Sequence, residues 1–234
     1  MAAALKPAAV FIAGAHTDVG KTHVACALIA AARAAGLGVE ALKPVASGFD
    51  PGNWASSDPG RLLAALGQPP TPHALDAISP WRFAAPLAPP MAAKLEGRAL
   101  PLAPIAAFCQ ARIRAAEADL VIVEGVGGLM SPIADRATGL DLMAALGLPV
   151  LLVGGSYLGA ISHLLTAAET LRGRGLRLLA AVVSESAEPA APDFRETLGS
   201  IAEFGVEAFP APRTASAPWV AELLARLMSA AAGG

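Results

Sequence analysis

The stretch from Ala13 to Ala25, AGAHTDVGKTHVA, decides the fold, because it joins the short apolar run AAVFI to an alanine-rich pattern of helical period. Within it, AHTDVGKT fits the relaxed phosphate-loop pattern A/G-x-x-x-x-G-K-S/T. In such a loop, backbone N–H groups at a helix N-terminus surround phosphate oxygens. Lys21 would reach the β- and γ-phosphates, and the Thr22 hydroxyl would bind Mg²⁺. The motif requires a strand before it and a helix after it, and both are present, so a glycine turn with a solvated lysine is the weaker interpretation.

Strand-like and helical patterns alternate along the rest of the chain. Apolar runs at 8–14, 39–45, 118–125, 148–155, 176–184 and 206–212 are typical of buried strands, and helical patterns cover 22–35, 105–116, 160–172, 193–204 and 219–231. This alternation predicts a mostly parallel sheet flanked by helices, in one phosphate-loop NTPase-type α/β domain over residues 1–234. Residues 50–104 hold most of the prolines, so we expect a long excursion there with one short helix, DPGRLLAALG.

Composition excludes several other classes of protein. The 234 residues are 55% hydrophobic and only 15% charged, which argues against disorder. A net charge of −2 gives no sign of a nucleic-acid or membrane-surface partner. The 21 residues from Leu142 to Ser162 carry no charge, but Pro149 and two glycines divide them into a helix end, a strand and a helix start. The two cysteines have no metal or redox spacing, and we expect a cytoplasmic protein with no membrane partner.

Several polar residues follow predicted strands, at the edge where parallel sheets bind ligands. Glu124 ends a buried strand among glycines, where phosphate-loop enzymes place a Mg²⁺ ligand. Lys43 by itself reads as a surface lysine, and its position at the edge makes a functional role equally plausible. Asp58, followed by Pro59, reads first as a helix N-cap. The residues alone leave the roles of Lys43 and Asp58 open.

Taken together, the motifs resemble the dethiobiotin synthetase family. The resemblance rests on AGAHTDVGKT, LKPVASG, SSD, FAAPLAPPMAAKLEGR, VIVEGVGGLMSPI and GSYLGAISH, in this order over nearly the whole chain. It implies a homodimeric ligase of biotin biosynthesis, a cyclo-ligase that forms C–N bonds. Such an enzyme uses ATP and Mg²⁺ to convert 7,8-diaminononanoate and CO₂ into dethiobiotin, ADP and phosphate. The route passes through a carbamate and a carbamic–phosphoric mixed anhydride.

The resemblance also implies roles for individual residues. Catalytic roles fall to Lys43, Lys21 and Thr17. The nucleotide would contact Asp18, Val19, Gly20, Lys21, Thr22, His23, Ser184 and Pro210. The diamine substrate would contact Ser47, Leu158, Gly159, Ala160 and Ser162, the last four at a helix start contributed by the partner subunit. Mg²⁺ would be held by Thr22, Asp58 and Glu124.

The chain departs from the family pattern at four of these motif positions. Asp18 stands where glutamate is common, His16 replaces an acidic residue often found in the loop, and Ser162 and Ser184 stand where asparagine is frequent. The alternative function is a partition-type (ParA/MinD-like) ATPase switch protein. Those proteins usually carry an extra lysine early in the loop, where this chain has Ala15 and His16. A second alternative is an amidating synthetase of cobalamin assembly. Such an enzyme needs a glutaminase domain, for which 234 residues leave no room.

Overall fold

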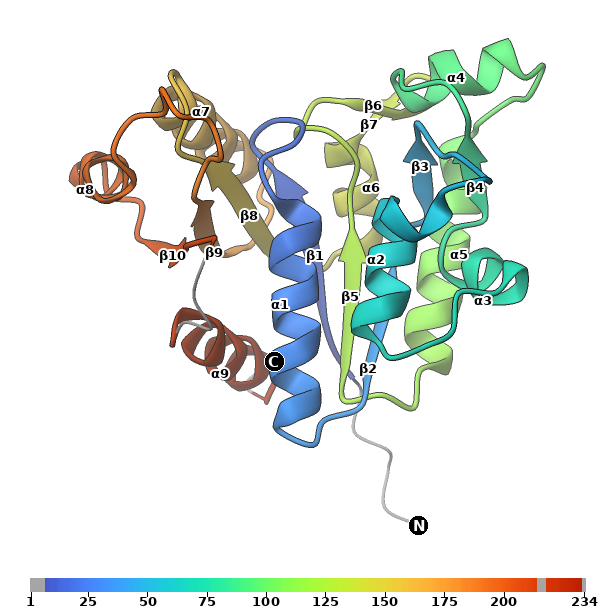
Figure 1. Ribbon diagram of the computed structural model, residues 1–234, viewed down its shortest axis with the longest axis horizontal. Helices are drawn as coiled ribbons and strands as arrows, with labels where there is room; N and C mark the ends of the chain where they lie inside the picture. Colours follow the sequence, from blue (N-terminus) through green and yellow to red (C-terminus); the bar gives the residue numbers. More distant parts are fainter. Residues whose placement is uncertain (1–6, 214–217, 233–234) are drawn as a thin grey trace.

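The six apolar runs form one six-stranded sheet in the computed structural model, which describes residues 7–213 and 218–232 (Figure 1). The strand order is β10-β9-β8-β1-β5-β2, and every pair of neighbours is parallel, as predicted. The strands are β1 (Ala8–Gly14), β2 (Val39–Leu42), β5 (Leu120–Glu124), β8 (Val150–Gly155), β9 (Leu178–Ser184) and β10 (Ala208–Ala211).

Helices cover both faces of this sheet, which explains why its strands are apolar almost throughout. In β1, Val10 and Ile12 face one core cluster while Phe11 and Ala13 face the other. The first cluster includes residues of α1 (Lys21–Ala34), α2 (Asp58–Ala65), α3 (Pro72–Ile78) and α9 (Trp219–Ala232). The second includes residues of α4 (Pro89–Leu95), α5 (Leu102–Ala115), α6 (Gly139–Leu146), α7 (Ala160–Gly173) and α8 (Phe194–Glu203).

The segment 50–104 is more regular than the sequence suggested, so the expectation of one short helix was wrong. Besides α2 it contains a 3₁₀ turn (Trp54–Ser56), α3, the strand β4 (Trp81–Phe83), α4 and the start of α5. Pro72 and Pro89 lie in the first turns of α3 and α4. Proline is favoured there because the first N–H groups of a helix need no intrahelical partner. Some prolines of this segment therefore begin helices, whereas others, such as Pro69, Pro70 and Pro80, lie in the connections.

The expected strand 39–45 is also divided into two. β2 ends at Leu42, and after Lys43 and Pro44 the chain enters β3 (Val45–Ser47), which pairs with β4 in a separate parallel sheet. Pro44 has no N–H group to continue the ladder. A small hairpin, β6 (Pro132–Ala134) with β7 (Ala137–Thr138), was likewise not expected. The break after β2 places Lys43 beside the carboxyl end of β5.

The charge-free stretch 142–162 is divided as predicted into the end of α6, the strand β8 and the start of α7. Among the described residues, no helix is both long enough and apolar enough to span a bilayer.

Candidate active site

The phosphate loop runs from the end of β1 to the start of α1 and is held by backbone that favours glycine. Gly20 has φ of 94° and caps α1 without a side-chain hydrogen bond, so the first N–H groups of the helix stay available to an anion. A Cβ atom on Gly20 would lie 2.5 Å from Ser184 Oγ. The close approach of β9 and the left-handed backbone therefore both require glycine at this position.

Lys21 extends along the loop toward the end of β5. Its Nζ donates to the carbonyl oxygen of Gly127 at 2.8 Å and to that of His16 at 3.4 Å. Burial, with a contribution from the ammonium group of Lys43, lowers the pKa of Lys21 to about 8, although Glu124 and Asp58 act in the opposite direction. A buried ammonium without a bonded carboxylate is well suited to receive an anionic ligand.

The centre of the site is a cluster of two carboxylates, a hydroxyl and a lysine. Glu124 Oε1 accepts from Thr22 Oγ1 at 2.7 Å and from Lys43 Nζ at 2.6 Å. Lys43 Nζ also lies 2.9 Å from Asp58 Oδ2 and donates to the Gly125 carbonyl at 2.8 Å. Lys43 is only 1% exposed, so the surface-lysine interpretation was wrong.

Lys43 and Asp58 stabilise each other's charged forms. Burial disfavours the charged form of Lys43, but Glu124 and Asp58 outweigh it and raise the pKa of the lysine. For Asp58, burial acts to raise the pKa, but the ammonium of Lys43 and hydrogen bonds from Lys43 and Thr22 lower it overall. Lys43 therefore carries its proton at neutral pH and cannot serve as a general base there.

Asp58 does not cap α2, contrary to the first interpretation of the sequence. Ser57 is the N-cap residue, and its Oγ accepts from the N–H of Gly60 at 3.3 Å. Asp58 is the first helical residue. Because the cap is supplied by Ser57, the carboxylate of Asp58 is available to Lys43, and the cluster joins α2 to β5.

The donor set of the cluster fits a magnesium ion. Thr22, Asp58 and Glu124 supply hydroxyl and carboxylate oxygens, which are the ligands that this hard cation prefers. Glu124 Oε2 is buried and has no hydrogen-bond partner among the described residues. A buried carboxylate oxygen normally has a partner, and a cation would provide one.

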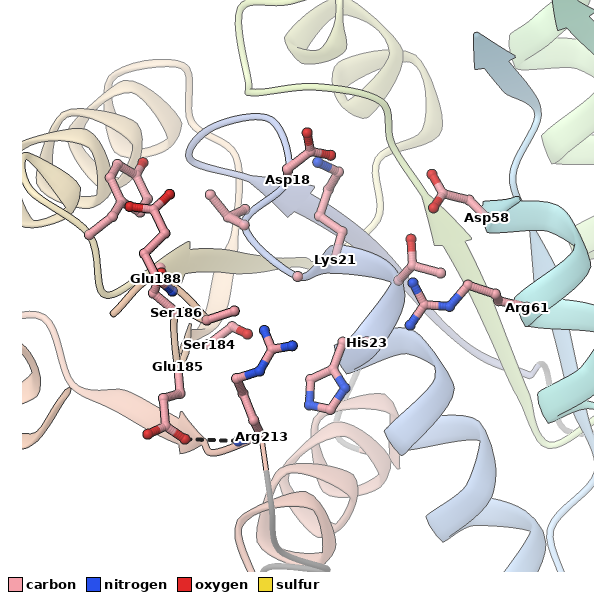
Figure 2. Close-up of a pocket in the computed structure, with 16 residues that line it drawn as sticks. Asp18, Lys21, His23, Asp58, Arg61, Ser184, Glu185, Ser186, Glu188 and Arg213 are labelled. Carbon is pink, nitrogen blue, oxygen red and sulfur yellow. Dashed lines mark hydrogen bonds between the residues drawn. The ribbon is translucent and has the colours of Figure 1, made fainter. Parts of the chain in front are cut away.

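A cavity of about 440 Å³ extends from the phosphate loop toward β9 (Figure 2). The predicted nucleotide contacts from Asp18 to His23, together with Ser184, line it, whereas Pro210 on β10 does not. Sequence reasoning missed Arg61, Gly155, Tyr157, Glu185, Ser186, Ala187, Glu188 and Arg213. The spacing of Asp58 and Arg61, three residues apart in one predicted helix, could have pointed to Arg61.

The predicted diamine contacts lie in two places. Leu158, Gly159 and Ser162 line a second cavity of about 530 Å³, and Ala160 is the buried first residue of α7. Tyr157 lines both cavities. Ser47 is half-buried on β3 and is not among the residues that line either cavity.

His16 and Thr17 are exposed on the phosphate loop. The ring of His16 stacks on that of His163 in α7, with centroids 5.2 Å apart, and His163 Nδ1 lies 2.8 Å from the hydroxyl of Tyr157. These aromatic contacts connect the loop to the start of α7, and no sequence spacing indicated them.

Comparison with known proteins points to one enzyme family. A family model described as an AAA domain matches residues 8–225. The ATP-dependent dethiobiotin synthetase BioD of Phenylobacterium zucineum is 57% identical over 215 residues, which cover 91% of this chain and 92% of that protein. The protein of the same name from Caulobacter vibrioides strain NA1000 is 53% identical over 222 residues, 94% of this chain and 98% of that protein.

Solved structures with a similar fold are far more distant in sequence. The MinC:MinD cell division complex of Aquifex aeolicus matches with a TM-score of 0.54 at 10% identity, over 97% of this chain and 96% of that one. A ParA family ATPase from Chlorobium tepidum matches with a TM-score of 0.50 at 15% identity, over 96% and 93%. These two likenesses establish the phosphate-loop fold alone. The high identity over almost the full length shows that the chain belongs to the family of ATP-dependent dethiobiotin synthetases.

Proposed function

We propose that the chain closes the ureido ring of dethiobiotin from 7,8-diaminononanoate, CO₂ and ATP, as a ligase of biotin biosynthesis. Its relatives at 57% and 53% identity bear the name of this activity. The observation that carries the proposal within the site is the buried Lys43, held between Glu124 and Asp58 and close to Lys21. The alternative, a partition-type ATPase, is supported only by a similar fold, because the MinD and ParA structures are 10% and 15% identical to this chain.

The reaction needs positioned charges more than a chemical group from the protein. One neutral amine of the substrate attacks CO₂ and loses a proton to give a carbamate. A carbamate oxygen attacks the γ-phosphate of ATP and ADP leaves, which forms the mixed anhydride. The second amine then attacks the carbonyl carbon, closes the ring and releases phosphate. Negative charge accumulates at the carbamate and the phosphates, so fixed cations accelerate these steps.

The two buried lysines would provide those cations. Lys21, at the head of α1, would contact the β- and γ-phosphates, and Lys43 would face the carbamate and the γ-phosphate. Thr17, on the exposed part of the loop, would contribute a hydroxyl near the transferred group. Magnesium held by Thr22, Asp58 and Glu124 would neutralise phosphate charge. Because Lys43 is already ionised and fixed by two carboxylates, it would need little reorganisation during the reaction.

The diamine would extend away from the nucleotide. Ser47 would contact its amine end, and its carboxylate would bind the N-terminus of α7 in the partner subunit of a homodimer. Gly159, with φ of 93°, caps α7 without a side-chain hydrogen bond. Its neighbours Leu158, Ala160 and Ser162 would complete that contact. The N–H groups of such a helix start favour an anion.

The direct test is to incubate the protein with ATP, Mg²⁺, bicarbonate and 7,8-diaminononanoate, and to detect dethiobiotin by mass spectrometry. ATP turnover that depends on the diamine is expected, and turnover without it would indicate an ATPase switch. Lys21→Gln should lower the rate by about 10²–10³ without unfolding the chain. Sedimentation velocity tests the homodimer separately. Failure to form dethiobiotin while ATP is bound would overturn the proposed reaction.

A further inference from the structure

One wall of the cavity beside the phosphate loop is basic, and of its residues the sequence analysis named only His23. Arg61 from α2, His23 from α1 and Arg213 after β10 all line the cavity, and we call these three residues the basic wall. Figure 2 shows the His23 ring between the side chains of Arg61 and Arg213. Because like charges repel, two guanidinium groups that line one cavity from separate elements favour an anion beside them.

The polar atoms of the basic wall lack protein partners. Within residues 7–213 and 218–232, neither the Arg61 nor the Arg213 guanidinium makes a hydrogen bond or an ion pair. In the same part of the chain, His23 Nε2 is buried and has no partner. By contrast, Arg33 Nη1 donates to the Ala65 carbonyl at the other end of α2, at 2.8 Å. Arg33 therefore ties α1 to α2, whereas Arg61 is left to meet a ligand.

Arg61 belongs to α2, and its position relative to α1 indicates which part of a nucleotide it would contact. Arg61 lies one helical turn after Asp58, and its side chain extends from α2 toward the start of α1 (Figure 2). Its carbonyl oxygen accepts from Cys26 Sγ at 3.6 Å, so Arg61 packs beside α1 beyond Thr22. In phosphate loops the lysine reaches the β- and γ-phosphates and the backbone N–H groups surround the α- and β-phosphates. The cavity beyond Thr22 and His23 therefore corresponds to the α-phosphate and the ribose.

We propose that Arg61 is an additional nucleotide-binding residue that pairs with the α-phosphate of ATP, with His23 and Arg213 beside it toward the ribose. This inference rests on ATP being the substrate under the proposed function. A guanidinium presents two parallel N–H donors to two phosphate oxygens, which an ammonium group cannot do. Because the α-phosphate is not transferred, Arg61 acts by binding and positioning the nucleotide in both the substrate and product states.

The test is calorimetric binding of ATP and ADP, each with Mg²⁺, to the native chain and to Arg61→Met, Arg61→Lys and Arg33→Met. Charge-assisted hydrogen bonds predict that Arg61→Met raises the Kd of both nucleotides by the same factor, roughly tenfold. Arg61→Lys should fall between Arg61→Met and the native chain. Arg33→Met removes an α1–α2 contact outside the cavity and should bind both nucleotides as the native chain does.

Three results would overturn the inference. Native-like binding of both ATP and ADP by Arg61→Met would remove Arg61 from the nucleotide site. A loss for ATP alone would place Arg61 at the γ-phosphate. An equal loss in Arg33→Met would show that helix packing, and not the charge, is responsible. Since binding is measured without the diamine, a failure to form dethiobiotin would count against the proposed function and leave this measurement valid.

Discussion

Replacing Glu124 with Gln should destabilise the protein strongly, because Glu124 neutralises buried positive charge. Its side chain is 0% exposed, and that of Lys43, 2.6 Å away, is 2% exposed. The cluster of Lys21, Lys43, Asp58 and Glu124 is formally neutral, and the substitution leaves it with one excess positive charge. Removing one partner of a buried pair typically costs 3–5 kcal/mol. Asp58 and the Gly125 carbonyl still contact Lys43, so we expect a loss of about 3 kcal/mol, at the lower end of that range.

A change of this size is readily measured. For a chain of this length, about 3 kcal/mol corresponds to a decrease in Tm of roughly 6–12 °C. The assay is urea and thermal unfolding followed by circular dichroism, without nucleotide or metal. The matched control is Glu40→Gln, which breaks the ion pair with Arg112. The side chain of Glu40 is 28% exposed and that of Arg112 is 40% exposed. Such a half-exposed pair contributes about 0–1 kcal/mol, so Tm should change little.

A double-mutant cycle separates the ion pair from the shape of the side chain. Lys43→Met with Glu124→Gln removes both charges, and the double variant should be more stable than the sum of the single losses predicts. If Glu124→Gln is no more destabilising than Glu40→Gln, or if the two losses at the site simply add, the reasoning about a neutralising buried pair is wrong.

Four further predictions concern ligand binding, the reaction and the dependence of stability on pH. Since the pKa of Lys21 is about 8, below its ordinary value of 10.5, the affinity for ATP should fall as pH rises through 8, and calorimetry should find no such fall in Lys21→Arg. Between about pH 8 and 10.5, Lys21 is protonated in the unfolded chain but has lost its proton in the folded chain. The contribution of Lys21 to the free energy of unfolding should therefore rise with pH over this range. Asp58→Asn leaves the Ser57 cap intact and should raise the Mg²⁺ concentration needed for half-maximal rate, whereas an unchanged magnesium titration would argue against a metal ligand. Ser184 has one rotating hydroxyl where the family resemblance implies an amide, so kcat/KM should discriminate less between ATP, GTP and CTP than in Ser184→Asn. Strong native rejection of GTP and CTP that the substitution leaves unchanged would refute this.

The positions of the six parallel strands along the chain and the phosphate loop could be predicted from the sequence because their causes are local. Continuous apolar runs indicate strands buried on both faces, and AHTDVGKT combines the glycine, lysine and threonine that a loop before a helix needs. Glu124 could be predicted for the same reason, since it directly follows a buried strand. The family motifs suggested the remaining ligands that we propose, but only by resemblance.

The tertiary structure decided what depends on neighbours that are distant in the sequence. Lys43 looked like a surface residue, because its two carboxylate partners are 15 and 81 positions away and only the break after β2 brings them together. The sequence favoured Asp58 as a helix cap, but in the structure Ser57 is the N-cap residue, so the carboxylate of Asp58 can contact Lys43. The basic wall has no motif, because α1, α2 and the segment after β10 each contribute one side chain. Charge and burial at such places follow from packing between elements, which no local pattern of residues records.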